Sequence, residues 1–265
     1  MVRGGEQRPD LTAVVPCYNE SKNIARTVDQ IHLAARSAAI GSHEIVVVDD
    51  CSTDDTAAVV AGLARLDPRI VLVRNPRNVG FGGAYKEGVR HARGTYVIMV
   101  PGDNAHPHEG ISPILRKAGE ADIIIPYLAN PEKRSKRRRV VSRTFTAVIN
   151  LLFGLHVPYY NGLVLHKRDL LRTIEITTDS FAYQAEALVK LIRSGARYAT
   201  VSVPISEQEK RFGNAFHLRN VYRVLKAIFD LWIKMRHFRA QPERLTAAAA
   251  KDGSGPLGVT PARGG

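Results

Sequence analysis

Five short apolar runs alternate with amphipathic segments along the first 126 residues, and this alternation restricts the fold more than any other feature of the chain. The runs hold Val and Ile in close succession, which is typical of strands buried on both faces of a parallel sheet. Helical connections between such strands pack helices against both faces. We therefore predict an α/β fold with a single doubly wound, mostly parallel sheet and flanking helices. The predicted strands are 11–16, 44–49, 70–73, 95–100 and 123–125, and the predicted helices are 19–36, 52 onward, 80–92 and 111–118.

Helix-capping residues mark two of these helix starts. Asn19 is the predicted N-cap of the first helix, and Ser52 or Thr53 that of the second. Asp54 and Asp55 would then lie in the first turn of the second helix, where the helix dipole favours acidic side chains.

The pattern changes after residue 127, where helices and strands follow less regularly. We predict a helix at 140–152, a strand at 160–165, a helix at 180–193, a strand at 198–203 and a long helix at 217–239. The last residues are rich in Ala, Gly and Pro, a composition that favours disorder. The predicted organisation is a flexible leader (1–10), one folded domain (11–215), a basic amphipathic C-terminal helix (216–240) and a disordered tail (241–265).

The net charge of +13 comes from two segments rather than from the whole surface. Residues 133–143 carry seven Lys or Arg and no acid, and residues 210–239 carry eight against Asp230. Such local charge indicates an anionic partner: phosphate groups, an anionic bilayer or nucleic acid. We expect no nucleic-acid partner, because the chain shows no recognised nucleic-acid-binding module.

Cysteine content and hydropathy indicate in which cellular compartment the protein resides. Cys17 and Cys51 are too few for a disulfide framework, so we expect reduced thiols in the cytosol. Neither a secretory signal nor a run of 18 apolar residues is visible, so no membrane-spanning helix is expected. The helix at 217–239 has apolar residues at helical spacing, Trp232 and several cations. It either lies on an anionic membrane surface or packs against the core or a second subunit, and both interpretations stay open.

Polar side chains follow the first two strands at the edge where parallel strands end. Pro16, Tyr18 and Glu20 follow the first strand, and Asp49 and Asp50 follow the second. Ligands bind beyond the carboxyl ends of such strands. A carboxylate there can accept the N–H of a nucleobase and an aromatic ring can pack on it, although the two aspartates could equally cap the next helix.

Asp103 follows the fourth strand in the sequence PGDN. A carboxylate at this position suits Mg²⁺ or Mn²⁺, which take oxygen ligands and are often shared with substrate phosphates. The alternative is a turn aspartate, since P-G-D-N is a strong turn sequence. His106 and His108 are weaker candidates for metal ligands.

Taken in order, the segments VVPCYNE, VVVDDCSTDDT and NVGFGGAYKEGVRHARG and the acid after the fourth strand resemble glycosyltransferases of family 2 with the GT-A fold. The second half narrows the resemblance to the polyprenyl-phosphate branch, the dolichol-phosphate mannose synthase-like proteins. It covers roughly residues 11–215.

The resemblance assigns the donor side of the site. Asp103 corresponds to the last acid of the family's D-x-D motif and is the implied ligand of Mg²⁺ or Mn²⁺. Pro101 replaces the first acid of that motif, and PYYNG at 158–162 replaces the family's D-x-T-S-G. The implied nucleotide-sugar residues are Pro16, Tyr18, Glu20, Asp50, Gly80 and Asp103, with Ala84 in the glycine-rich segment.

The resemblance also assigns the acceptor side. Gln184 and Glu186 match a Q-x-E motif, and the segment with Arg211, Gly213 and Asn214 loosely matches a phosphate-contacting motif. Glu186 would be a base for a hydroxyl acceptor, or would organise Arg211 or the sugar if the acceptor is a phosphate. The implied acceptor-phosphate residues are Arg138, Arg139, Ser142 and Arg211, and the implied catalytic residues are Asp103, Arg139, Glu186 and Arg211.

The implied function is inverting transfer of a sugar from a UDP- or GDP-linked donor to a polyprenyl (dolichyl or undecaprenyl) phosphate. The implied location is the cytoplasm, peripheral on the inner face of the membrane. The alternatives are a family 2 enzyme with a glycan or other hydroxyl acceptor, and a catalytically inactive member.

Overall fold

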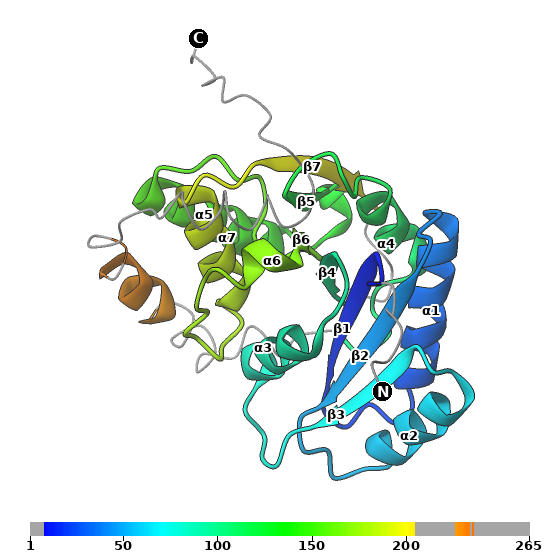
Figure 1. The fold of residues 1–265 in the computed structure, drawn as a ribbon. Helices are drawn as coiled ribbons and strands as arrows, with labels where there is room; N and C mark the ends of the chain where they lie inside the picture. Colours follow the sequence, from blue (N-terminus) through cyan, green and yellow to red (C-terminus); the bar gives the residue numbers. More distant parts are fainter. Residues whose placement is uncertain (1–7, 205–225, 234, 236–265) are drawn as a thin grey trace.

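The computed structural model describes residues 8–204, 226–233 and Met235. Within them, seven strands form one mixed sheet in the order β3-β2-β1-β4-β6-β5-β7 (Figure 1). Only β6 runs antiparallel to its neighbours, β4 and β5, so the expected mostly parallel sheet is confirmed. The strands are β1 (Leu11–Cys17), β2 (His43–Asp49), β3 (Ile70–Arg74), β4 (Tyr96–Met99), β5 (Ile123–Leu128), β6 (Leu165–Lys167) and β7 (Tyr198–Val203).

Helices cover both faces of this sheet, as a doubly wound fold requires. On one face α1 (Ile24–Ser37), α2 (Thr56–Leu66) and α4 (His108–Leu115) bury their apolar sides. On the other face α3 (Phe81–His91), α5 (Lys136–Phe153) and α7 (Tyr183–Arg193) do the same. The short helices η1 (Pro131–Lys133) and α6 (Arg168–Leu171) lie in connections.

The first two helices begin later than predicted. The residues expected to cap them, in the β1–α1 and β2–α2 turns, form hydrogen bonds with each other instead. Asn19 adopts a left-handed backbone (φ 58°), and its side-chain oxygen accepts a hydrogen bond from Thr53 N at 2.8 Å. Ser52 Oγ in turn accepts from Asn19 N at 2.9 Å. The predicted caps Asn19, Ser52 and Thr53 are therefore wrong: Asn23 and Asp55 precede the two helices. These bonds hold the two turns side by side at the sheet edge.

Two elements of the second half also differ from prediction. The basic stretch is itself helical, since α5 begins at Lys136 with Ser135 as its N-cap rather than at residue 140. The predicted strand 160–165 is reduced to Leu165–Lys167. Tyr160 is buried and donates its hydroxyl to Asn150 Oδ1 at 2.8 Å, which draws this segment toward α5 instead of into the sheet.

The chain ends are described in part. Thr95 N donates to Pro9 O and Tyr96 N to Asp10 O, so residues 9 and 10 of the predicted leader are fixed to the sheet. Of the predicted helix 216–240, residues 226–233 are helical, and the predicted tail 241–265 lies outside the described residues. Ile228, with Leu231 and Met235, joins the core on the α3 face. No helix in the described part of the chain is long and apolar enough to cross a membrane.

Candidate active site

The β1–α1 turn presents an aromatic ring beside a carboxylate. Pro16 is buried in β1, whereas Tyr18 is 47% exposed and can pack on a planar ring. Glu20 Oε2 accepts from Asn23 Nδ2 at 2.7 Å. Burial raises the pKa of Glu20. The hydrogen bond from Asn23 lowers this pKa and the negative charge of Asp103 raises it, and the overall shift is upward. The fold thus brings Asp103, far away in sequence, into the electrostatic range of Glu20.

Asp50 holds the segment that leads into α3. Its side chain is buried, and Oδ1 accepts from Asn75 Nδ2 at 2.8 Å and Val79 N at 3.0 Å. Oδ2 accepts from Gly80 N at 2.9 Å. Both carboxylate oxygens are therefore engaged by the protein. Asp50 fixes the glycine-rich turn, and its assignment to the nucleobase is a prediction that the structure does not test.

The amino end of α3 is fixed from a second side by a loop that the sequence did not single out. Gly82 N donates to Asp179 O at 3.0 Å, and Lys86 Nζ pairs with Asp179 Oδ1 at 2.6 Å. A side chain at Gly82 would meet backbone atoms of this loop at 2.8 Å, so the close approach requires glycine. Gly80, at φ 85°, precedes the helix. A pocket of about 510 Å³ opens between Gly80, the 178–180 loop and residues 226–230.

Glu186 anchors that loop and does not fit the predicted role of a general base. The residue is only 3% exposed; Oε1 accepts from Thr177 N at 2.9 Å, and Oε2 from Thr178 N at 3.0 Å. Lys190 Nζ donates to Oε1 at 2.6 Å. Burial alone would raise its pKa, but the hydrogen bonds from Lys190, Thr177 and Thr178 lower it overall. A buried, ion-paired carboxylate of lowered pKa is a poor proton acceptor, and these contacts therefore favour a positioning role for Glu186 over that of a general base.

Asp103 lies in the turn after β4, where Oδ1 accepts from Ala105 N at 3.0 Å. Gly102 packs so tightly on β1 that a side chain there would lie 2.7 Å from Cys17 Cβ. No cluster of three His, Cys, Asp or Glu residues suited to a metal occurs in residues 8–204, 226–233 and 235. A single carboxylate still fits a Mg²⁺ or Mn²⁺ ion that takes its other ligands from water and a substrate diphosphate.

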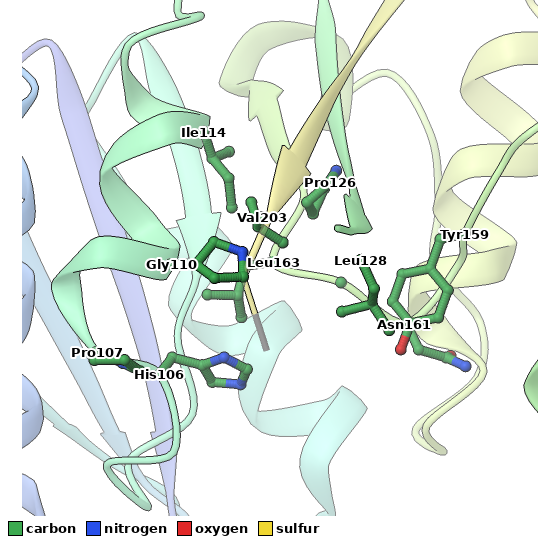
Figure 2. A pocket seen from close by; sticks show the side chains of 12 residues that line it. His106, Pro107, Gly110, Ile114, Pro126, Leu128, Tyr159, Asn161, Leu163 and Val203 are labelled. Atoms are coloured by element: carbon green, nitrogen blue, oxygen red, sulfur yellow. The ribbon is translucent and has the colours of Figure 1, made fainter. Parts of the chain in front are cut away.

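The two candidate histidines do not join Asp103 in a metal-binding set. His108 Nδ1 lies 3.2 Å from Gln30 Oε1 and 3.2 Å from Glu109 Oε2. Figure 2 shows His106 facing a small pocket of about 40 Å³, with Tyr159 and Asn161 on its far side. Tyr159, Asn161 and Gly162 of the altered PYYNG segment therefore line this pocket together with His106.

A larger pocket of about 390 Å³ lies along one face of α5 and shares Tyr159 with the small one. Arg134 Nη1 donates to the Tyr159 hydroxyl at 2.9 Å, and its guanidinium lies 5.8 Å from the centre of that ring. This contact fixes one arginine at the rim. The polar side chains that line the pocket, besides Tyr127 and Tyr159, are Arg134, Arg139, Ser142, Arg143, Thr146 and Asn150.

The expected acceptor-phosphate residues are only partly brought together. Arg139 and Ser142 line the α5 pocket, whereas Arg138 is not among its lining residues; their contact with an acceptor phosphate stays a prediction. Arg138 lies about 100° around the helix from Arg139. Arg143 was missed, although it follows Arg139 at a spacing of four residues and so shares its face.

The remaining residues that were predicted to belong to the site either lie away from this pocket or fall outside the residues that the structure describes. Gln184 is buried, with Nε2 at 3.5 Å from His166 Nε2. Arg211, Gly213 and Asn214 lie outside the described residues.

The seven-stranded mixed sheet and its flanking helices match solved glycosyltransferase structures of the GT-A fold. A mannosyltransferase of Pyrobaculum calidifontis, solved with GDP-Man and Mn²⁺, has a TM-score of 0.60 at 21% identity, covering 95% of this chain and 77% of that one. Glucosyl-3-phosphoglycerate synthase of Mycobacterium tuberculosis, solved with Mn²⁺, UDP and phosphoglyceric acid, has a TM-score of 0.64 at 18% identity, covering 84% and 78%.

The chain belongs to glycosyl transferase family 2, which it matches over residues 12–180. A dolichyl-phosphate beta-glucosyltransferase of Trichomonas vaginalis is 33% identical over 144 residues, covering 51% of this chain and 43% of that protein. An undecaprenyl-phosphate 4-deoxy-4-formamido-L-arabinose transferase of Sodalis glossinidius is 23% identical over 223 residues, covering 83% and 66%. The chain thus spans less than two thirds of the length of each of these relatives.

Proposed function

We propose that this protein transfers a sugar, with inversion, from a UDP- or GDP-linked donor to a polyprenyl phosphate. The observation that carries the proposal is the α5 pocket, which is lined by Arg134, Arg139 and Arg143 and by no carboxylate among the described residues. The two relatives reported above, which are named as dolichyl-phosphate and undecaprenyl-phosphate sugar transferases, support the same class of acceptor.

The side chains that line the pocket favour one of the two kinds of acceptor. A hydroxyl acceptor needs a base to take its proton, whereas a phosphate monoester is largely ionised at pH 7, with a second pKa near ~6. Arginine binds phosphate oxygens through paired N–H groups. Glu186 is buried in an ion pair with Lys190 and is not among the residues that line this pocket. The arginines of the pocket therefore favour an ionised phosphate acceptor, which needs no base.

The transfer is a single displacement at the anomeric carbon. A phosphate oxygen of the acceptor forms the new C–O bond, and the bond to the donor diphosphate breaks on the opposite face. The nucleoside diphosphate leaves with the electron pair of the broken bond. Because the new bond forms on the opposite face, the anomeric configuration inverts. Arg139 and Arg143 hold the attacking phosphate, while Tyr18 and the turn fixed by Asp50 hold the donor.

The leaving diphosphate requires compensation of its negative charge. Asp103 would hold Mg²⁺ or Mn²⁺ there, and the cation would supply Lewis-acid stabilisation of the departing phosphate oxygens. Because a polyprenyl acceptor resides in a bilayer, the protein would act as a peripheral protein on the inner, cytoplasmic face of the membrane.

The first test is transfer of radiolabel from a panel of UDP- and GDP-sugars to detergent-dispersed undecaprenyl or dolichyl phosphate. We expect label to enter the organic phase in the presence of Mg²⁺ or Mn²⁺ and to be lost in Asp103→Asn. Arg139→Ala should raise the acceptor KM by about tenfold or more, as loss of a charged hydrogen bond predicts.

The matched control is Arg65→Ala, an exposed arginine on α2 at the opposite face of the sheet, which should leave the acceptor KM unchanged. Donor binding without transfer to any lipid phosphate, but with transfer to a hydroxyl acceptor, would reject the proposed acceptor. Donor binding without transfer to either would indicate an inactive member.

A further inference from the structure

One side of helix α5 carries five apolar side chains that are exposed to solvent, interrupted by the polar Thr144, and the packing of the domain does not explain them. Leu151 is 84% exposed and Val140 is 64% exposed. Val141, Val148 and Leu152 are 43%, 40% and 37% exposed. The core contacts of α5 lie on another side of the helix, through Phe145, Ile149 and Phe153. An amphipathic surface helix normally turns such residues inward, so this face is suited to an apolar partner.

The exposed face begins at the rim of the α5 pocket. Ala147 lines the pocket, and Val140 and Leu151 lie seven residues before it and four residues after it. At 3.6 residues per turn these three positions share one side of the helix. A partner that covers this face therefore lies directly beside the arginines of the pocket.

The amino-terminal half of the same helix is strongly basic. Lys136 and Arg137 are exposed, and no acidic residue lies in the first turn. Cations at this end of a helix are opposed by the helix dipole, so an external anion stabilises the arrangement. Basic residues that flank exposed Leu and Val are the pattern of a helix lying in the headgroup region of an anionic bilayer.

We propose that α5 is the membrane-docking surface of this protein. Leu151, Val140 and Val148 enter the boundary of the acyl chains, and Lys136 and Arg137 contact anionic headgroups. Charge complementarity favours an anionic bilayer over a second copy of this chain, because pairing two such basic helices brings like charges together. The inference rests on the proposed function: docking here would place the pocket at the membrane surface where a polyprenyl phosphate presents its headgroup.

The test is sedimentation of the full chain with vesicles of phosphatidylcholine, with and without phosphatidylglycerol, free of donor and polyprenyl phosphate. We expect binding to the anionic vesicles that weakens as salt rises. Leu151→Glu should lower the partition coefficient by about tenfold or more, the effect of losing one buried leucine. The matched control is Leu66→Glu on α2, where the leucine is 86% exposed, and it should bind as the native chain does.

A third variant tests the competing surface. Phe229 is 58% exposed on the helical segment 226–233, so loss of binding in Phe229→Glu with normal binding in Leu151→Glu would overturn the proposal. Equal binding by Leu66→Glu and Leu151→Glu would overturn it as well. A changed oligomeric state in Leu151→Glu without a change in vesicle binding would assign the face to a second copy instead.

The vesicle test is independent of catalysis. Absence of transferase activity with intact vesicle binding would refute the proposed function and leave the docking surface standing. Unaltered transfer by Leu151→Glu on detergent-dispersed acceptor, together with lost vesicle binding, would support both.

Discussion

Replacing Glu186 with glutamine distinguishes a positioning carboxylate from a catalytic one. The native carboxylate accepts four hydrogen bonds, from Thr177 N, Thr177 Oγ1, Thr178 N and Lys190 Nζ. Glutamine has one acceptor oxygen. If that oxygen takes the place of Oε1, the amide NH₂ group faces Thr178 N, and two donors oppose each other.

The cost follows from this geometry. Loss of one hydrogen bond to a charged group is worth about 1.5–3 kcal/mol. Lys190, itself only 8% exposed, also loses its counter-ion, and a buried pair broken on one side typically costs about 3–5 kcal/mol. The two costs overlap, because the range for a broken buried pair already contains its lost hydrogen bonds, so we expect Glu186→Gln to lower the free energy of unfolding by about 3–5 kcal/mol. The double variant with Lys190→Met should recover part of that loss, since it removes both buried charges.

Urea unfolding and transfer kinetics, measured on the same variants, provide the test. Glu109→Gln is the matched control, because this side chain is 63% exposed and its loss should leave stability nearly unchanged. A general base contributes roughly 10²–10⁴-fold to the rate. If Glu186→Gln keeps native stability and loses more than about a hundredfold in kcat, the positioning role is refuted and Glu186 is the base.

Two further predictions concern the same region. Gly82→Ala places a side chain against the backbone at Asp179 and should destabilise the fold by about 1–3 kcal/mol and weaken donor binding. Gly110→Ala on α4 meets nothing within 4 Å, so calorimetry should find it no less stable than the native chain, and equal losses in the two variants would contradict the packing argument. Because the folded-state pKa of Glu186 lies below its usual value of 4.5, its stabilisation is complete above that pH and is lost as pH falls through the lower value. Acid unfolding curves should show this component in the native chain, and an identical curve for Glu186→Gln would contradict it.

Two buried carboxylates thus fix the segments around the amino end of α3 from opposite directions. Asp50 fixes the turn that enters α3, and Glu186 fixes the loop that packs on the same helix end. Neither is exposed. Both residues match family motifs and hold neighbouring segments in place, whereas Tyr18 is exposed and available to a ligand.

The order of elements in the first half could be predicted because it depends on local hydrophobic pattern. Buried parallel strands require unbroken apolar runs, and β1, β2 and β3 begin within one residue of their predicted starts. The starts of the helices were predicted less accurately than those of the strands. Asn19 and Ser52 have the side chains of caps, but a neighbouring turn offered each of them a different partner.

The kinds of side chain that gather at the sheet edge could be predicted, since neighbouring parallel strands end at the same edge. The sequence alone determined that Tyr18, Asp50 and Asp103 follow three such strands and that α5 carries the basic cluster. Only the tertiary structure decided which carboxylates stay available to a ligand, because burial and hydrogen-bond partners arise from residues distant in sequence. It likewise decided that Arg139 and Arg143 line the pocket, because the side of α5 that packs on the core fixes which of its arginines can share one cavity.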